Sequence, residues 1–69
     1  MPLTLADKNT PYTITRITGK DDVKRHLRNL GFAENETVSI KQSIGGNVIV
    51  EIRGARIALS DSLARRIQI

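Results

Sequence analysis

The residues of this chain best suited to chemistry stand together in the stretch VKRHLRNLGF, residues 23–32. Lys24, Arg25 and Arg28 are cations at neutral pH, and His26, the only histidine, becomes a fourth cation when it is protonated. Such a cluster could contact nucleic-acid phosphates, contribute to a metal site or dock on an acidic protein. It could equally be the solvated side of a packed helix.

A helix over residues 21–30 is expected to position these side chains. Val23, Leu27 and Leu30 recur at the i, i+4 and i+7 spacing of one helical face, which should face the core. His26 then lies near the boundary of that face. The side chains expected to point outward are Lys24, Arg25, Arg28 and Asn29.

Both ends of the expected helix carry sequence signals. Asp21 and Asp22 fall in the first turn, where the helix dipole stabilises negative charge. Gly31 stands where a left-handed residue commonly ends a helix. Phe32 follows it, and we expect its ring to plug the core over the helix end.

The chain has few residues that could form a metal site or an active site. Stable transition-metal sites use three or four ligands, whereas this chain has one His, no Cys and one adjacent pair, Asp21-Asp22. His26 is the only candidate general base, and no serine or threonine has an identifiable base and orienting partner. The glycines of Gly45-Gly46-Asn47 are not followed by the Lys-Ser/Thr of a phosphate-binding loop. We therefore predict no catalytic residue, cofactor or stable metal site, and a protein that is not an enzyme.

The overall charge points to an anionic partner. Eleven Lys and Arg against seven Asp and Glu give a net charge of +4. The chain has only two aromatic residues, Tyr12 and Phe32, too few to build an extended stacking platform for single-stranded nucleic acid. The simplest interpretation of the outward cations is a solvated helix face. Among functional uses, docking on an acidic protein is favoured, and a small nucleic-acid-binding barrel is the alternative.

The remainder of the chain reads as short strands. The expected strands are Tyr12–Ile17, Thr37–Ile44, Asn47–Arg53, a third meander strand ending at Ser60, and Arg66–Ile69. Gly45-Gly46 and Gly54-Ala55 are the expected turns of the meander. Ser60 is the expected N-cap of a single helical turn through Ala64. About five short strands with one helix predict a mainly β, small and closed or nearly closed barrel, formed by one domain over residues 1–69.

Two sequence blocks carry a family resemblance: ITGKDDVKRHLRNLGF and GGNVIVEIRGARIALSDSLARRI. They resemble the ferrous iron transport protein A (FeoA) family, which implies an SH3-like barrel. Where that family commonly has glycine in two turns, this chain has Asn9 and Asn35, and asparagine also tolerates left-handed backbone. The residues of the structural signature are Val23, Leu27, Leu30, Gly31, Phe32, Gly45, Gly46, Gly54, Ile57 and Leu59.

The resemblance implies a function as well as a fold. It implies a non-enzymatic accessory protein of bacterial ferrous iron uptake that acts on the cytoplasmic part of the FeoB transporter. Nucleic acid is an unlikely partner because of the scarcity of aromatic residues. The same module is similar to the C-terminal domain of iron- and manganese-dependent repressors, although a chain starting at its own Met1 fits the stand-alone protein better. The candidate partner-binding residues are Lys24, Arg25, Arg28, Arg53 and Arg56.

The expected location is the cytoplasm. No apolar run approaches the ~20 residues needed to cross a bilayer, and the first residues lack the pattern of a secretion signal. The absence of cysteine fits a reducing compartment. Contact with a membrane is then expected only through the transporter.

Overall fold

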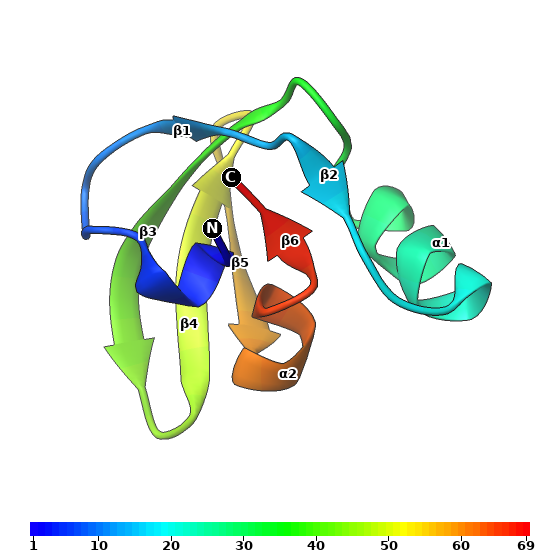
Figure 1. The fold of residues 1–69 in the computed structure, drawn as a ribbon. Coiled ribbons are helices and arrows are strands. Elements are labelled where there is room, and N and C mark those ends of the chain that lie inside the picture. Colours follow the sequence, from blue (N-terminus) through cyan, green and yellow to red (C-terminus); the bar gives the residue numbers. More distant parts are fainter.

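Two antiparallel sheets and two helices make up the domain, which a computed structural model describes over residues 1–69. The larger sheet has strand order β1-β3-β4-β5 and the smaller one pairs β2 with β6 (Figure 1). The elements in chain order are a 3-10 turn η1 (Leu3–Leu5), β1 (Tyr12–Thr13), β2 (Arg16–Ile17), α1 (Asp21–Asn29), β3 (Thr37–Ile44), β4 (Asn47–Ile52), β5 (Ala55–Ser60), α2 (Asp61–Ala64) and β6 (Ile67–Gln68).

The expected first strand is wrong as a single element. Its halves join different sheets, because β1 pairs with β3 and β2 pairs with β6. Between them Ile14 is fully buried and its amide bonds to the carbonyl of Glu36, whereas the amide of Thr15 bonds to Gln68. The chain thus changes partner at this point, which turns a corner of the barrel and gives six strands instead of five.

The β3-β4-β5 meander follows the sequence expectation, with one shifted turn. Gly45 and Gly46 connect β3 to β4, and both have positive φ. The second turn is Arg53-Gly54 and not Gly54-Ala55, because Ala55 already pairs with Ile52. Arg53 and Gly54 have φ of 52° and 79°, the left-handed pair that a tight two-residue hairpin turn needs.

The core fills the space between the two sheets with aliphatic side chains. β4 contributes Val48, Val50 and Ile52, all 3% exposed or less, as their alternation predicts. Leu3 of η1 is also fully buried, although its segment has no periodic pattern of apolar residues. The buried hydrophobic residues are Leu3, Ile14, Ile17, Leu27, Phe32, Val38, Ile40, Val48, Val50, Ile52, Leu59, Ala64 and Ile67.

The C-terminal segment closes the barrel against the first residues. The hydroxyl of Ser60 accepts a hydrogen bond from the amide of Leu63 over 3.3 Å, which confirms the expected N-cap of α2. β6 then pairs with β2, and Ile69 exchanges backbone hydrogen bonds with Met1. The two chain ends therefore lie together (Figure 1).

Candidate functional site

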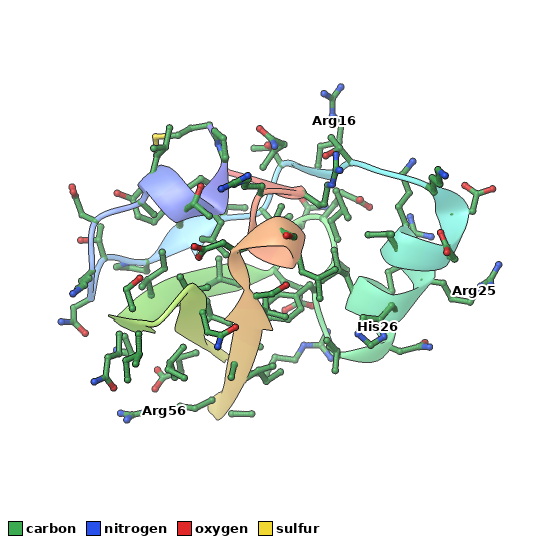
Figure 2. All side chains as sticks on the ribbon, turned by 90° about the horizontal axis from the view of Figure 1, so that it is seen from below. Arg16, Arg25, His26 and Arg56 are labelled. Carbon is green, nitrogen blue, oxygen red and sulfur yellow. The ribbon has the colours of Figure 1, made fainter.

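The helix α1 stands to one side of the two sheets and carries three of the predicted partner-binding cations (Figure 1). Arg25 and Arg28 are exposed, as expected, whereas Lys24 is half-buried. His26, expected at the boundary of the buried face, is exposed. Figure 2 shows Arg25 pointing away from the sheets into solvent.

No carboxylate neutralises these cations. The ion pairs of the structure involve Lys41, Arg53 and Arg56 and none of the residues of α1. Asp21 and Asp22 lie on the same helix, yet neither forms an ion pair with the cations one turn further on. The α1 cations are therefore available to an external anionic group.

The apolar side of α1 fixes the helix to the barrel. Leu27 is fully buried, and Val23 and Leu30 pack against the core with partial exposure. The helix ends at Asn29, with Leu30 as its C-cap and Gly31 at φ 108°, which confirms the expected left-handed end. Phe32 is fully buried, as expected of a core plug. The cations thus extend from a helix whose opposite side is anchored.

The other two predicted partner-binding residues are already engaged within the chain. Arg53 forms a two-pronged pair with Glu36, in which Nε donates to Oε2 over 3.1 Å and Nη2 donates to Oε1. These bonds favour the charged forms, so they lower the pKa of Glu36 and raise the pKa of Arg53. Most of the Arg53 side chain remains exposed, at 68%.

Arg56 shares one carboxylate with Lys41. Glu51 lies opposite Arg56 in the β4-β5 ladder, and its Oε2 is 3.7 Å from the Arg56 Nε. The other oxygen of Glu51 is 3.9 Å from the Lys41 Nζ. Glu51 therefore compensates one of the two positive charges beside it.

The predicted cations form two separate groups. Lys24, Arg25 and Arg28 share α1. Arg53, in contrast, lies in the turn between β4 and β5, and Arg56 lies near the start of β5. Arg25 and Arg56 extend from opposite sides of the molecule in Figure 2. One flat partner surface could therefore not contact both groups at once.

The structure adds Arg16, which the sequence reading did not single out. It lies on β2 beside Ile17, and because side chains alternate along a strand it points outward where Ile17 points to the core. Figure 2 shows it extending into solvent. In one continuous strand over residues 12–17, Arg16 would share the face of the buried Ile14, so its outward position follows only from the break between β1 and β2.

Other kinds of site have no visible basis in the structure. No three His, Asp or Glu side chains are grouped so that they could hold a metal ion. The surface has no pocket. No helix has the length and apolar character to span a bilayer.

Solved structures share this fold over nearly its full length. A crystal structure of an iron uptake regulatory protein, FeoA, is 24% identical, with a TM-score of 0.86 over 96% of this chain and 88% of that one. FeoA of Stenotrophomonas maltophilia, a prokaryotic SH3 domain protein complexed with zinc, is 29% identical, with a TM-score of 0.82 over 97% and 86%. The architecture is therefore the SH3-like barrel that the sequence predicted.

The fold also occurs inside longer proteins. A manganese-dependent transcriptional repressor is 18% identical, with a TM-score of 0.86 over 97% of this chain but only 39% of its own length. At this identity the likeness concerns the fold alone. A search among curated proteins finds no match. The FeoA domain model, in contrast, matches residues 1–69, and this chain therefore belongs to the FeoA domain family.

Proposed function

We propose that this chain is an accessory protein of ferrous iron uptake that binds the cytoplasmic part of the FeoB transporter and supports its assembly or activity. The observation that carries the proposal is the match to the FeoA domain model over residues 1–69. The S. maltophilia relative has been put forward as a bacterial ferrous iron transport activating factor. The family is one of small transport-associated domains and not a known enzyme family.

The α1 cations are the surface that we assign to this interaction. Arg25 and Arg28 are exposed, unpaired and carried by a helix anchored through Leu27. A preformed cationic surface attracts an acidic partner over distance. Because the helix is already anchored, binding requires little further ordering of its backbone. Arg53 and Arg56 form the second candidate surface. Their ion pairs with Glu36 and Glu51 would have to break before the two arginines could bind acidic groups of the partner.

Nucleic acid is the less favoured partner of these cations. Phe32 is fully buried and cannot stack on a base. Tyr12 is half-buried, and its hydroxyl accepts a hydrogen bond from the amide of Asp7 over 3.2 Å. Sequence-tolerant binding of single strands depends on exposed aromatic rings beside the cations, and neither ring of this chain meets that need.

The test of the proposed function is Fe(II) uptake in a strain that lacks this gene and has no second copy. We expect impaired uptake under anaerobic or acidic conditions, where Fe(II) persists, and recovery when the wild-type gene is restored. A complementing gene with Leu27→Gln, which should unfold the domain, serves as the negative control. Normal uptake in the deletion strain would contradict the proposed function.

A further inference from the structure

The net charge of the protein is confined to two segments of the chain. Residues 16–32 hold five Lys and Arg against two Asp, and residues 61–69 hold two Arg against one Asp. In residues 1–15 and 33–60 the numbers of cations and carboxylates are equal. The whole excess of +4 therefore belongs to β2, α1, α2 and the residues around β6.

The pairing of β2 with β6 brings these two segments together. Ile17 pairs with Ile67, and both side chains are buried, so the neighbouring residues of each strand face outward. Arg16 of β2 therefore faces outward, and Arg66, the residue before β6, is exposed opposite Thr18. The carbonyl of Arg66 accepts from both the amide and the hydroxyl of Thr18, which fixes its position beside β2.

Arg66 also borders the start of α1. A Cβ atom at Gly19 would lie 3.5 Å from the Cδ of Arg66, so the stem of this arginine runs over the link between β2 and α1. Lys20 follows as the N-cap of α1. Arg16, Arg66 and Lys20 are all exposed, and none of them forms an ion pair. We call these three residues the basic face.

We infer that the basic face binds the surface of an anionic phospholipid membrane. Its cations come from β2, the turn before β6 and the N-cap of α1. Attraction to an anionic lipid surface needs only that the charges lie within a Debye length of it. The exposed large hydrophobic side chains are Met1, Leu5 and Ile44, and none of them belongs to the basic face. The basic face therefore lacks the apolar centre typical of a protein interface.

Two further features favour lipid over other anions. The basic face carries no aromatic residue for stacking on bases, since Tyr12 and Phe32 lie elsewhere in the chain. Met1 is 52% exposed, and its backbone pairs with Ile69 on the edge of β6 that faces away from β2, so an exposed apolar residue lies across β6 from Arg16. Cations next to an exposed apolar side chain suit a membrane interface, where the charges meet headgroups and the apolar chain enters the boundary.

The experiment is co-sedimentation of the full chain with vesicles and no other protein. We expect binding to vesicles containing about one third phosphatidylglycerol in phosphatidylcholine, none to phosphatidylcholine alone, and loss of binding in about 0.5 M NaCl. Each cation near such a surface contributes about fivefold in affinity, so Arg16→Gln/Arg66→Gln should bind about 25-fold more weakly. Because no transporter is present, the result is independent of the proposed function.

Arg56 provides a control of matched charge. Arg16→Gln and Arg56→Gln each remove one cation, and the two residues extend from opposite sides of the molecule (Figure 2). We expect Arg16→Gln to weaken vesicle binding and Arg56→Gln to leave it nearly unchanged, with the thermal midpoint of each variant confirming the fold. Absence of binding to anionic vesicles, or equal effects of the two variants, would overturn the inference. Preferential capture of the protein by an added RNA oligonucleotide would overturn it in favour of a nucleic-acid partner.

Discussion

The backbone amide of Phe32 donates a hydrogen bond to the carbonyl oxygen of Leu27 over 3.0 Å, and both side chains are fully buried. The amide of Gly31 bonds in turn to the carbonyl of Arg28 over 2.9 Å. These two bonds form a Schellman motif, in which the residue after the left-handed position returns to cover the last helical turn. The end of α1 that carries Arg28 is thereby fixed to the core.

Replacing Leu27 should destabilise the whole domain. Leu27→Gln places an amide in a fully buried site and removes the packing of the leucine side chain. Loss of a buried leucine costs about 2–5 kcal/mol, and an unpaired buried amide adds about 1–3 kcal/mol. Urea denaturation followed by circular dichroism should show a largely unfolded variant, whereas Asn29→Gln on the exposed side of α1 should retain the wild-type midpoint. Equal midpoints for the two variants would show that the helix does not anchor the core.

A substitution at Gly31 tests the helix end without touching the core. Gly31 has φ 108°, and a Cβ added there would meet no atom within 4 Å, so the cost of Gly31→Ala comes from the backbone alone. We expect a loss of about 1–2 kcal/mol in the free energy of unfolding. Asn29→Ala, in the last turn of the same helix, is the control and should change it by less than about 0.5 kcal/mol. Unchanged stability of Gly31→Ala would mean that this end does not require a left-handed residue.

Acid should weaken the pair between Glu36 and Arg53. The hydrogen bonds from Arg53 lower the folded-state pKa of Glu36 below its ordinary value of 4.5. The stabilisation by this pair is therefore complete above the unfolded-state pKa and is lost as the pH falls through the lower folded-state pKa. Between about pH 5 and about pH 3 the thermal midpoint of the wild type should fall further than that of Glu36→Gln.

The control for the acid effect is Glu34→Gln. Glu34 is exposed and forms no ion pair, so this variant should follow the wild type across the same pH range. Because the pair lies at the surface, the effect should be small and should decrease with added salt. If the thermal midpoints of Glu36→Gln and the wild type fall equally with pH, the pair does not stabilise the protein.

Charge reversal distinguishes the two candidate docking surfaces. Arg25→Glu/Arg28→Glu changes only exposed, unpaired side chains of α1 and should leave the thermal midpoint nearly unchanged. Binding to the cytoplasmic part of the transporter should fall about tenfold or more, because two attractive contacts become repulsive. Arg53→Glu/Arg56→Glu is the matched variant of equal charge change. A stronger loss of binding in that second variant would move the interface to the β4-β5 turn.

Features fixed by neighbouring residues could be predicted from the sequence. The helix α1, the Gly45-Gly46 turn and the N-cap at Ser60 each depend on residues within a few positions. The tolerance of asparagine for left-handed backbone was also confirmed, since Asn9 and Asn35 have φ of 61° and 72°. Where short-range geometry decides a structure, residue types at known spacing carry enough information.

Features that depend on distant partners could not be predicted in this way. The break between β1 and β2 arises because Gln68 binds one half of the segment and Val38 the other. The only local sign of the break is that the buried Ile14 and Ile17 are three residues apart. In one continuous strand, residues three apart point to opposite faces. The basic face depends likewise on the pairing of Arg16 with Gln68, some fifty residues later in the chain. No local pattern of residues predicts this pairing.

The most direct test of the proposed function is co-purification of this protein with the FeoB transporter from its own cells. The tagged wild type should recover the transporter at low salt, and Arg25→Glu/Arg28→Glu should recover much less of it at equal expression. Retention of the purified cytoplasmic part of the transporter on the immobilised protein would show that the contact is direct. If a folded wild-type protein captures neither the intact transporter nor its cytoplasmic part, the proposed interaction is contradicted.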